Sequence, residues 1–244
     1  MKQSRFSGLL FYSMVILLAS CAGGGSEKKT STDSTTADTS TAMVTPPITT
    51  ITTPQNMMVV THKVANYAKW QTSYDAHDSV RLANGAHSYV IGRGLKDSNM
   101  ILVAVKVDDT AKAKAFAKSP DLKKAMQKGG VTGTPTFALV TMVFQDTATI
   151  ASDIRSRTTF TVKDWGAWQT AFEDGKQERL DNGIIVRAYG HNADNNKKVV
   201  LVTALMDTAK AFAYYKSDAL KKRRAAGGVI GEPDRFLYRV VKRY

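Results

Sequence analysis

Cysteine is almost absent from this chain of 244 residues, which has only Cys21. A single thiol excludes a disulfide within the chain, a cysteine-based metal site and a redox pair. Histidine is also scarce, with four residues, and none stands at a metal-ligand spacing from another histidine or from the cysteine. The sequence therefore predicts neither a metal site nor a cofactor.

Familiar catalytic motifs are missing as well. There is no Gly-x-Ser-x-Gly nucleophile elbow, and the glycine-rich segments 92–94 and 129–133 lack the lysine spacing of a phosphate loop. Acidic residues are the minority, 21 against 34 lysines and arginines, which gives a net charge of +13. A basic balance suits nucleic acid, an anionic membrane surface or simple solubility. Nucleic acid is disfavoured as a partner by an export signal at the start of the chain.

Long apolar runs are absent after residue 18. The run at residues 9–18 follows Lys2 and Arg5 and is too short to span a bilayer comfortably. It ends in the segment 18–21, Leu-Ala-Ser-Cys, which resembles the lipobox of bacterial lipoproteins. That resemblance implies a signal peptide over residues 1–21 and lipid attachment at Cys21. The alternative is an ordinary secretory signal with a coincidental cysteine.

The lipobox also implies a location. A chain acylated at Cys21 is anchored in a lipid bilayer of the cell envelope. Ala22 follows the cysteine where an aspartate would favour the inner membrane, so we expect the outer membrane of a Gram-negative bacterium. Residues 22–56 are rich in Gly, Ser, Thr and Pro and poor in large apolar groups, and they are therefore predicted to be a disordered tether.

The remainder of the chain, after the tether, contains an internal repeat. Residues 57–145 (repeat 1) and 156–244 (repeat 2) share many identical residues at a constant offset of 98 positions. Matched pairs include Trp70 and Trp168, Arg81 and Arg179, Asp109 and Asp207, Ser119 and Ser217, and Pro135 and Pro233. A fixed offset means that no insertion separates the copies, and self-similarity of this kind indicates a repeated structural unit.

The pattern within each copy predicts an α+β fold. In repeat 1, apolar runs at 57–64, 88–93, 100–107 and 136–144 predict strands, and helical spacing follows Asn66 and Asp109. The order β-α-β-β-α-β is that of a ferredoxin-like unit. Continuous apolar runs such as 101–105 indicate strands buried on both faces. We therefore expect the two units to pack sheet to sheet as an intramolecular α+β barrel.

The same residues resemble the dimeric α+β barrel superfamily, which includes antibiotic-biosynthesis-monooxygenase-like domains. The resemblance is carried by the helix with Trp70, Tyr74, His77 and Arg81, by the Ser-Pro-x-Leu-Lys segment at 119–123, and by Gly-Val-x-Gly-x-Pro at 130–135. Members form the barrel as homodimers, so the tandem copies imply a monomer. They include cofactor-free oxygenases of quinol-like aromatics, haem-handling enzymes and isomerase-like proteins.

The candidate pocket lies on the first long helix of each copy. Trp70, Tyr74, His77 and Arg81 follow at helical spacing, as do Trp168, Phe172 and Arg179. These faces either line a pocket or simply pack against the sheet. Each repeated arginine either binds an anion or pairs with a nearby carboxylate, Asp75 or Asp78 in repeat 1. Only repeat 1 has a titratable histidine and a phenol on this face, which makes His77 the best candidate for a general base.

Two classes of function agree with these observations. The first is an anchored module that binds a small, apolar or aromatic ligand, or a partner, without chemistry. The alternative is a cofactor-independent monooxygenase-like or isomerase-like enzyme with an aromatic substrate. The lack of a strong catalytic constellation favours the first.

Overall fold

The computed structural model describes residues 49–244. The predicted signal peptide, the attachment site Cys21 and most of the predicted tether lie outside the described residues. The sheet begins earlier than expected, because β1 (Thr50–Ile51) and the start of β2 (Gln55–Val64) fall within the range assigned to the tether. The polar side chains at the start of β2 concealed this strand. Gln55 and Asn56 bond to Gln145 and Thr141 on a neighbouring strand.

Repeat 1 forms the predicted β-α-β-β-α-β unit, with each helical segment split in two. After β2 its elements are α1 (Tyr67–Ala76), α2 (Asp78–Ala83), β3 (Ala86–Gly94), β4 (Met100–Val107), α3 (Thr110–Ala117), α4 (Pro120–Lys128) and β5 (Val131–Asp146). Asn66, Asp109 and Ser119 cap the helices with their side chains, as the sequence predicts.

Repeat 2 has the same elements, and its four helices and one of its strands lie 98 residues later at both ends. They are β6 (Ile154–Val162), α5 (Trp165–Asp174), α6 (Lys176–Asp181), β7 (Ile184–Asn192), β8 (Asn195–Leu205), α7 (Thr208–Tyr215), α8 (Asp218–Ala226) and β9 (Val229–Arg243). Among residues 49–244, no helix has the length and apolar character needed to cross a membrane.

The helix predicted to run from Tyr67 past Arg81 is interrupted. His77 ends α1 and precedes α2 with a ψ of 12°, and Gly175 does the same between α5 and α6 with a ψ of 9°. The break frees carbonyl groups at the end of α1 and α5, which then need new donors. The four residues of the predicted face still point to the same side of the chain, because the interruption is one residue long.

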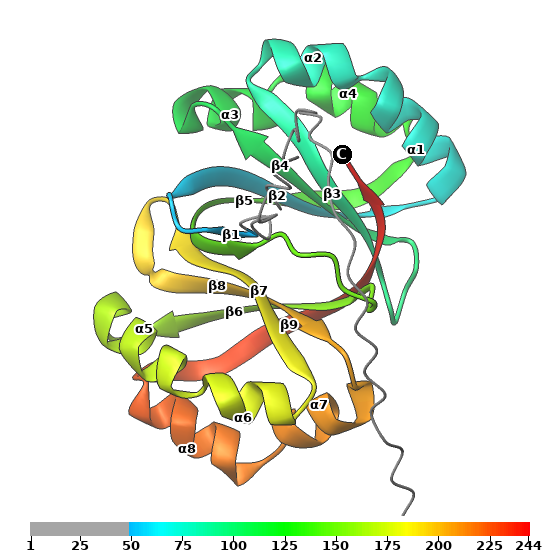
Figure 1. Cartoon of the computed structure of the whole chain (residues 1–244). Coiled ribbons are helices and arrows are strands. Elements are labelled where there is room, and N and C mark those ends of the chain that lie inside the picture. The colour runs from blue at the N-terminus through cyan, green and yellow to red at the C-terminus, as the bar shows by residue number, and fades with distance from the viewer. Residues whose placement is uncertain (1–48) are drawn as a thin grey trace, which may run out of the picture. The chain divides into compact units, whose positions relative to one another are not determined.

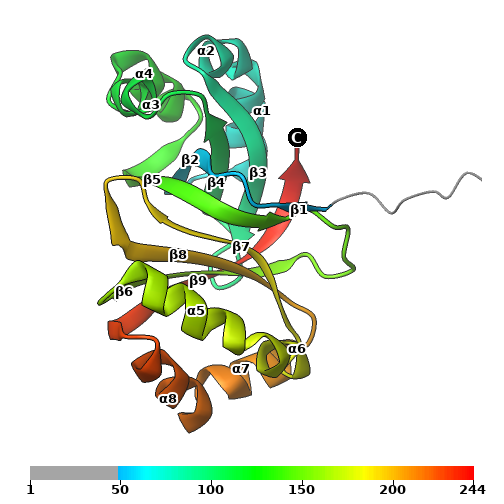
Figure 2. The same ribbon diagram turned by 60° about the vertical axis from the view of Figure 1, so that its left-hand side comes forward.

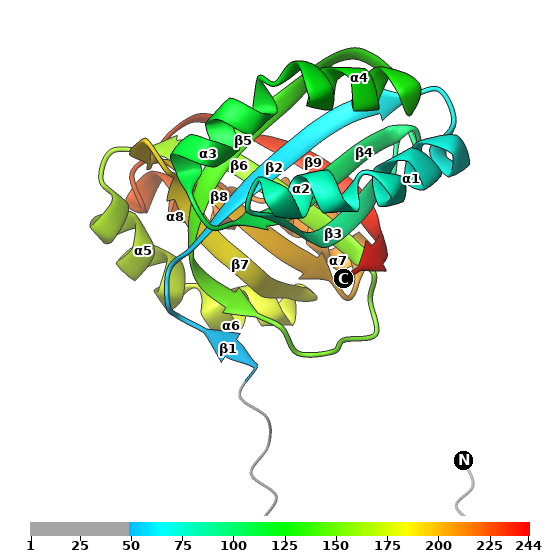
Figure 3. The same cartoon turned by 90° about the horizontal axis from the view of Figure 1, so that it is seen from above.

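The strands close into a single barrel. Repeat 1 contributes the order β5-β2-β4-β3 and repeat 2 the order β9-β6-β8-β7, and the pairs β3–β9 and β5–β7 join the two sheets edge to edge. Helices α1–α4 cover the outer face of one sheet and α5–α8 that of the other, while the inner faces of the two sheets face each other (Figure 1, Figure 2). Seen from above, α1–α4 lie across the strands of repeat 1 (Figure 3).

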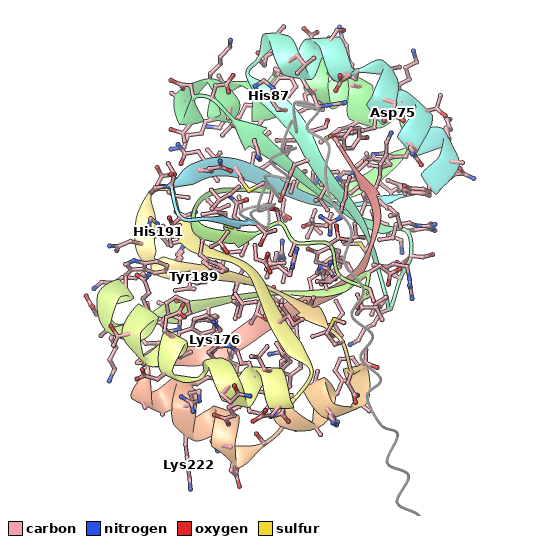
Figure 4. All side chains as sticks on the ribbon, viewed as in Figure 1. Asp75, His87, Lys176, Tyr189, His191 and Lys222 are labelled. Atoms are coloured by element: carbon pink, nitrogen blue, oxygen red, sulfur yellow. The ribbon has the colours of Figure 1, made fainter. Side chains whose placement is uncertain are left out.

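The closure depends on two long strands. β5 pairs with β2 and, through residues 140–145, with β7; β9 pairs with β6 and, through residues 238–243, with β3. The end of β9 is also tied to repeat 1 by side chains, because Lys242 and Tyr244 both donate to Asp75. Figure 4 labels Asp75 on α1. The barrel therefore uses the last residues of the chain.

The apolar core has two kinds of region. One lies between each sheet and its own helices, around Trp70 in repeat 1 and Trp168 in repeat 2. The other fills the lumen between the two sheets and draws on both repeats, with buried Met57, Leu102 and Val200 among its members. The strands are therefore buried on both faces, as their continuous apolar runs predict.

Candidate active site

A stack of four side chains stands between the helices and the sheet of repeat 1. The ring of His62 on β2 contacts Trp70 at a centroid distance of 5.5 Å, and Trp70 stacks on Tyr74 at 5.1 Å. The guanidinium of Arg81 lies 3.6 Å from the centroid of the Tyr74 ring. The predicted helix face is therefore a continuous column that begins on the sheet and ends at α2.

Repeat 2 holds the same column with less polar members. Phe160 contacts Trp168 at 5.5 Å, Trp168 stacks on Phe172 at 4.9 Å, and Arg179 lies 3.8 Å from the centroid of the Phe172 ring. Phe160 stands where repeat 1 has His62, and Phe172 where it has Tyr74. The seven predicted pocket residues thus divide between two pockets, one in each repeat.

The repeated arginines hold the break between the helices. Arg81 donates to the main-chain oxygen of Tyr74 at 2.5 Å, and Arg179 donates to that of Phe172 at 2.6 Å. These are carbonyls at the end of α1 and α5. Arg81 also pairs with Asp78 at 2.8 Å. Of the two roles considered for this arginine, pairing within the protein is the one the geometry shows, and the carboxylate is Asp78, since Asp75 pairs with Lys242.

His62 is the feature that sequence reasoning missed. Its side chain is 4% exposed, and neither ring nitrogen has a hydrogen-bond partner among the residues that the structure describes. Burial lowers the pKa of His62 from 6.5 to about 4, so the imidazole is neutral at pH 7. A buried polar group without a partner is costly, and a catalytic role is one of the explanations for it. The sequence signals this histidine only by comparison of the repeats, because the residue 98 positions after His62 is the apolar Phe160.

Polar partners surround Tyr74 in repeat 1. Its hydroxyl lies 2.9 Å from the hydroxyl of Ser88 on β3, and Ser88 donates to Asp78 at 3.5 Å. Burial raises the pKa of Tyr74 even though Arg81 opposes the shift, so the phenol stays protonated. Val186 and Lys176 occupy the places of Ser88 and Asp78 in repeat 2. This network therefore belongs to one repeat alone.

His77 lies at the outer end of the site. Its ring is parallel to that of Phe116, with centroids 6.4 Å apart, and partial burial followed by the nearby Arg81 lowers its pKa. It borders both the inner pocket and a groove of about 740 Å³ between α1 and α4. His77 is therefore placed at an entrance, while His62 is placed at the floor.

The inner pocket of repeat 1 is small and mostly apolar. Its volume is about 60 Å³, and its walls include all four predicted residues, Trp70, Tyr74, His77 and Arg81, together with His62. Leu122 and Met126 close it from α4, a helix without a buried residue. A cavity of about 150 Å³ holds benzene. An aromatic ring therefore enters only if α4, with Leu122 and Met126, shifts outward.

The pocket of repeat 2 has a different character. It measures about 80 Å³, and four arginines line it, Arg179, Arg223, Arg224 and Arg235. Arg223 pairs with Glu178 at 2.5 Å, and Arg235 stacks on Tyr215 at 3.6 Å. It contains no histidine, so it lacks a base that titrates near neutral pH.

Metal or cofactor binding finds little support in these residues. The described part of the chain holds no group of three or more His, Cys, Asp or Glu side chains that could bind a metal ion. His62 is a lone imidazole in a cavity of about 60 Å³.

Comparison with known proteins identifies the fold. No protein-family model matches the chain, and no curated protein matches its sequence. Among solved structures, it is similar to a candidate monooxygenase from Fusobacterium nucleatum subsp. nucleatum, with a TM-score of 0.52, 13% identity, and coverage of 78% of this chain and 93% of that one. It is similar to an anthrone oxidase-like protein with a TM-score of 0.52 and 15% identity, covering 77% of this chain and 92% of that one. It is also similar to a candidate chlorite dismutase with a TM-score of 0.52 and 12% identity, covering 78% of this chain and 96% of that one.

These neighbours are dimeric α+β barrel proteins of the monooxygenase-like and chlorite dismutase-like kind, so the expected fold is confirmed. At such low identity the likeness extends to the fold alone.

Proposed function

We propose that the repeat 1 pocket is the active site of a cofactor-independent oxygenase that acts on a small phenolic or quinol-like aromatic. The observation that carries this proposal is the buried, neutral and unpartnered imidazole of His62 in an apolar pocket with a protonated phenol. The fold neighbours named as a monooxygenase and an anthrone oxidase-like protein lend support.

The chemistry needs a base and a means to stabilise negative charge. His62 takes a proton from an acidic C–H or phenol group of the substrate. Tyr74 donates a hydrogen bond to the substrate oxygen on which charge develops. The imidazolium then lies beside the substrate anion, and this ion pair raises the pKa of His62 from its low resting value. His62 replaces His77 as the proposed base, and His77 is assigned to the entrance.

The electron-rich anion reacts with dioxygen, which is the oxidant. At a CH₂ group between aromatic rings, the two C–H bonds are replaced by a C=O bond, one oxygen atom of O₂ enters the product, and the other leaves as water with the two hydrogens. A hydroquinone likewise gains one oxygen atom of O₂ and loses two hydrogens to become a hydroxyquinone, and the other oxygen atom leaves as water. The apolar walls exclude bulk water from the anion.

The test is oxygen consumption by the purified chain with hydroquinone as a single-ring substrate and anthrone as a fused-ring one. We expect turnover that His62→Phe abolishes, since phenylalanine occupies the same place in repeat 2. His87→Gln is the matched control, because His87 is exposed on β3 and pairs with Asp108. Its turnover should equal that of the wild type. Turnover that survives in His62→Phe would rule out the proposed base.

The binding module differs from the enzyme in one measurable respect. If the chain binds these aromatics stoichiometrically, and His62→Phe alters the affinity, but no oxygen is consumed, the pocket is a binding site without chemistry. Mass spectrometry of a ligand carried through purification would then identify what it holds.

The location and the oligomeric state of the protein are proposals as well. We propose that the chain is a lipoprotein of the cell envelope, held at the outer membrane through acylated Cys21, and a monomer because both barrel halves come from one chain. Cys21→Ala should abolish the incorporation of labelled fatty acid; labelling that persists in this variant would contradict the anchor. Light scattering should give a monomer mass at all concentrations.

A further inference from the structure

The barrel lumen contains a concentration of positive charge that the proposed reaction does not use. A cavity of about 80 Å³ lies between the two sheets, and four arginines and one aspartate line it: Arg155, Arg157, Arg187, Arg243 and Asp146. Arg155 and Arg187 are 3% and 6% exposed. Buried charges are normally paired, so the partners of each arginine decide what the cluster does.

Only one of the two buried arginines has a carboxylate partner. Arg187 pairs with Asp146 at 2.8 Å. Arg155 donates to the main-chain oxygens of Ser152 and Ile154, and within residues 49–244 it forms no ion pair. These carbonyls accept hydrogen bonds without neutralising the guanidinium. The charge on Arg155 is thus buried without a directly paired carboxylate among the described residues, and the nearby Asp153 attracts it from a greater distance.

The third arginine is only weakly paired. Arg157 lies two residues further along β6, on the same inward face, and donates to Thr61 at 3.2 Å. Its nearest carboxylate, Asp234, is 3.9 Å away and largely exposed. Arg243 stands at the rim. Burial, with Arg187 and Arg243 adding repulsion, lowers the pKa of Arg155 to about 10, which still leaves it charged at pH 7.

A phenol completes the donor set. Tyr238 is 4% exposed and lines the lumen cavity together with the arginines. Its ring lies directly on the bare backbone of Gly92, where a Cβ atom would meet the ring carbons. Burial raises the pKa of Tyr238 to about 12, so the hydroxyl is a donor. The donor is held in place by the opposite repeat.

The cluster is asymmetric between the repeats. Met57, Val59, Tyr89 and Gln145 stand 98 positions before Arg155, Arg157, Arg187 and Arg243, so repeat 2 supplies all four guanidinium groups and repeat 1 supplies none. A barrel assembled from two identical chains would have such a cluster twice or not at all. A second cavity of about 380 Å³, beside the connector 147–153, shares Arg155 and Arg243 with the lumen cavity.

We propose that the lumen binds one small oxyanion, a phosphate or a short carboxylate, between Arg155, Arg157 and the hydroxyl of Tyr238, with Arg243 at the mouth. The guanidinium fork suits either anion, since both present two oxygens to paired N–H donors. The volume limits the ligand to a few heavy atoms. This site is separate from the repeat 1 pocket and does not depend on the activity proposed there.

The test is isothermal titration of the purified chain with inorganic phosphate and, separately, with succinate, in chloride buffer of matched ionic strength. We expect saturable binding with one site per chain for at least one of the two anions, and the anion that binds identifies the source. The same anion should raise the melting temperature of the protein, because it binds only the folded state. Absence of binding by both anions up to about 10 mM overturns the proposal.

Three variants test whether the anion binds at the proposed residues of the lumen. Arg155→Gln should weaken binding at least about tenfold, as expected for loss of a hydrogen bond to a charged group. Tyr238→Phe keeps the ring on Gly92 and should weaken binding severalfold, and it serves as the decisive variant if Arg155→Gln does not fold. Arg235→Gln is the control, since Arg235 is a desolvated arginine in the repeat 2 helix pocket. Loss of binding in Arg235→Gln but not in Arg155→Gln or Tyr238→Phe would refute the site.

Discussion

Replacing His62 with phenylalanine should make the protein more stable, which is unusual for a buried position. The variant gives repeat 1 the residue that repeat 2 already has there, and the tilted rings of Phe160 and Trp168 are in contact at the same 5.5 Å at which His62 contacts Trp70. It removes two ring nitrogens that have no partner among the described residues. Removing an unsatisfied buried polar group should increase the free energy of unfolding by about 1–3 kcal/mol at pH 7.5.

The stability gain of His62→Phe over the wild type should grow as the pH falls. The pKa of His62 is about 4 in the folded protein and near 6.5 when unfolded, so the unfolded chain binds more protons between these values. The stability contributed by neutral His62 is therefore complete above pH 6.5 and declines as the pH drops toward 4. The gap between the two pKa values corresponds to roughly 3 kcal/mol. Phenylalanine does not titrate, so the variant avoids this loss.

Urea denaturation of both proteins at pH 7.5, 6, 5 and 4 measures the effect. Carboxylates titrate over the same range in both proteins, so the informative quantity is the difference between the two free energies of unfolding. We expect this difference to widen by roughly 3 kcal/mol between pH 7.5 and pH 4. A difference that stays constant with pH would mean that His62 protonates normally in the folded state, and the burial argument would fail.

Three further changes test the architecture. Arg81→Met and Arg179→Met should each lower the free energy of unfolding by about 1.5–3 kcal/mol, because a charged donor to the helix carbonyl is lost; an unchanged urea midpoint would contradict this role. Gly190→Ala should destabilise strongly, since its Cβ would clash with the β5 backbone, whereas Gly166→Ala, in a helix with room for the methyl, should stabilise by about 0.5–1 kcal/mol. Thermal melts that rank these two variants the other way would refute the seam geometry. Deleting residues 240–244 removes part of the β3–β9 pairing and should expose the barrel to limited proteolysis, while resistance equal to the full chain would show that this pairing is dispensable.

Local signals in the sequence were sufficient to predict the helices and strands of each ferredoxin-like unit. Asn66, Asp109 and Ser119 cap helices because their side chains accept from main-chain N–H groups three residues on, a purely local interaction. The repeat then predicted the second unit from the first. The continuous apolar run at 101–105 predicted burial on both faces, and with it a barrel.

Features that depend on pairing between distant parts of the chain could not be predicted in the same way. β5 and β9 were expected to span about nine residues each and have 16 and 15. Pro135 and Gly133 near the start of β5 obscured the strand, because such residues normally interrupt pairing. The edge pairing at β3–β9 and β5–β7 depends on this extra length, so sheet-to-sheet packing was predicted while the seams were not.

The site was predicted in part for a similar reason. Trp70, Tyr74, His77 and Arg81 were grouped because helical spacing places them on one face. His62 belongs to a strand, and its proximity to Trp70 arises only when the helix packs on the sheet. The arginines of the lumen alternate with outward residues on β6, but the sequence does not reveal which face is inside.

The position of β9 has a consequence for how the molecule is made. β9 is the last element of the chain, and it lies between β3 and β6 in the closed sheet. A ribosome delivers β9 after both of its partner strands, so the edges of β3 and β6 stay open until β9 has been made. Contacts between residues as distant as Asp75 and Tyr244 also make folding slow. A growing chain therefore has an interval in which two strand edges are open to pairing with other chains, and the 15 residues of β9 end that interval.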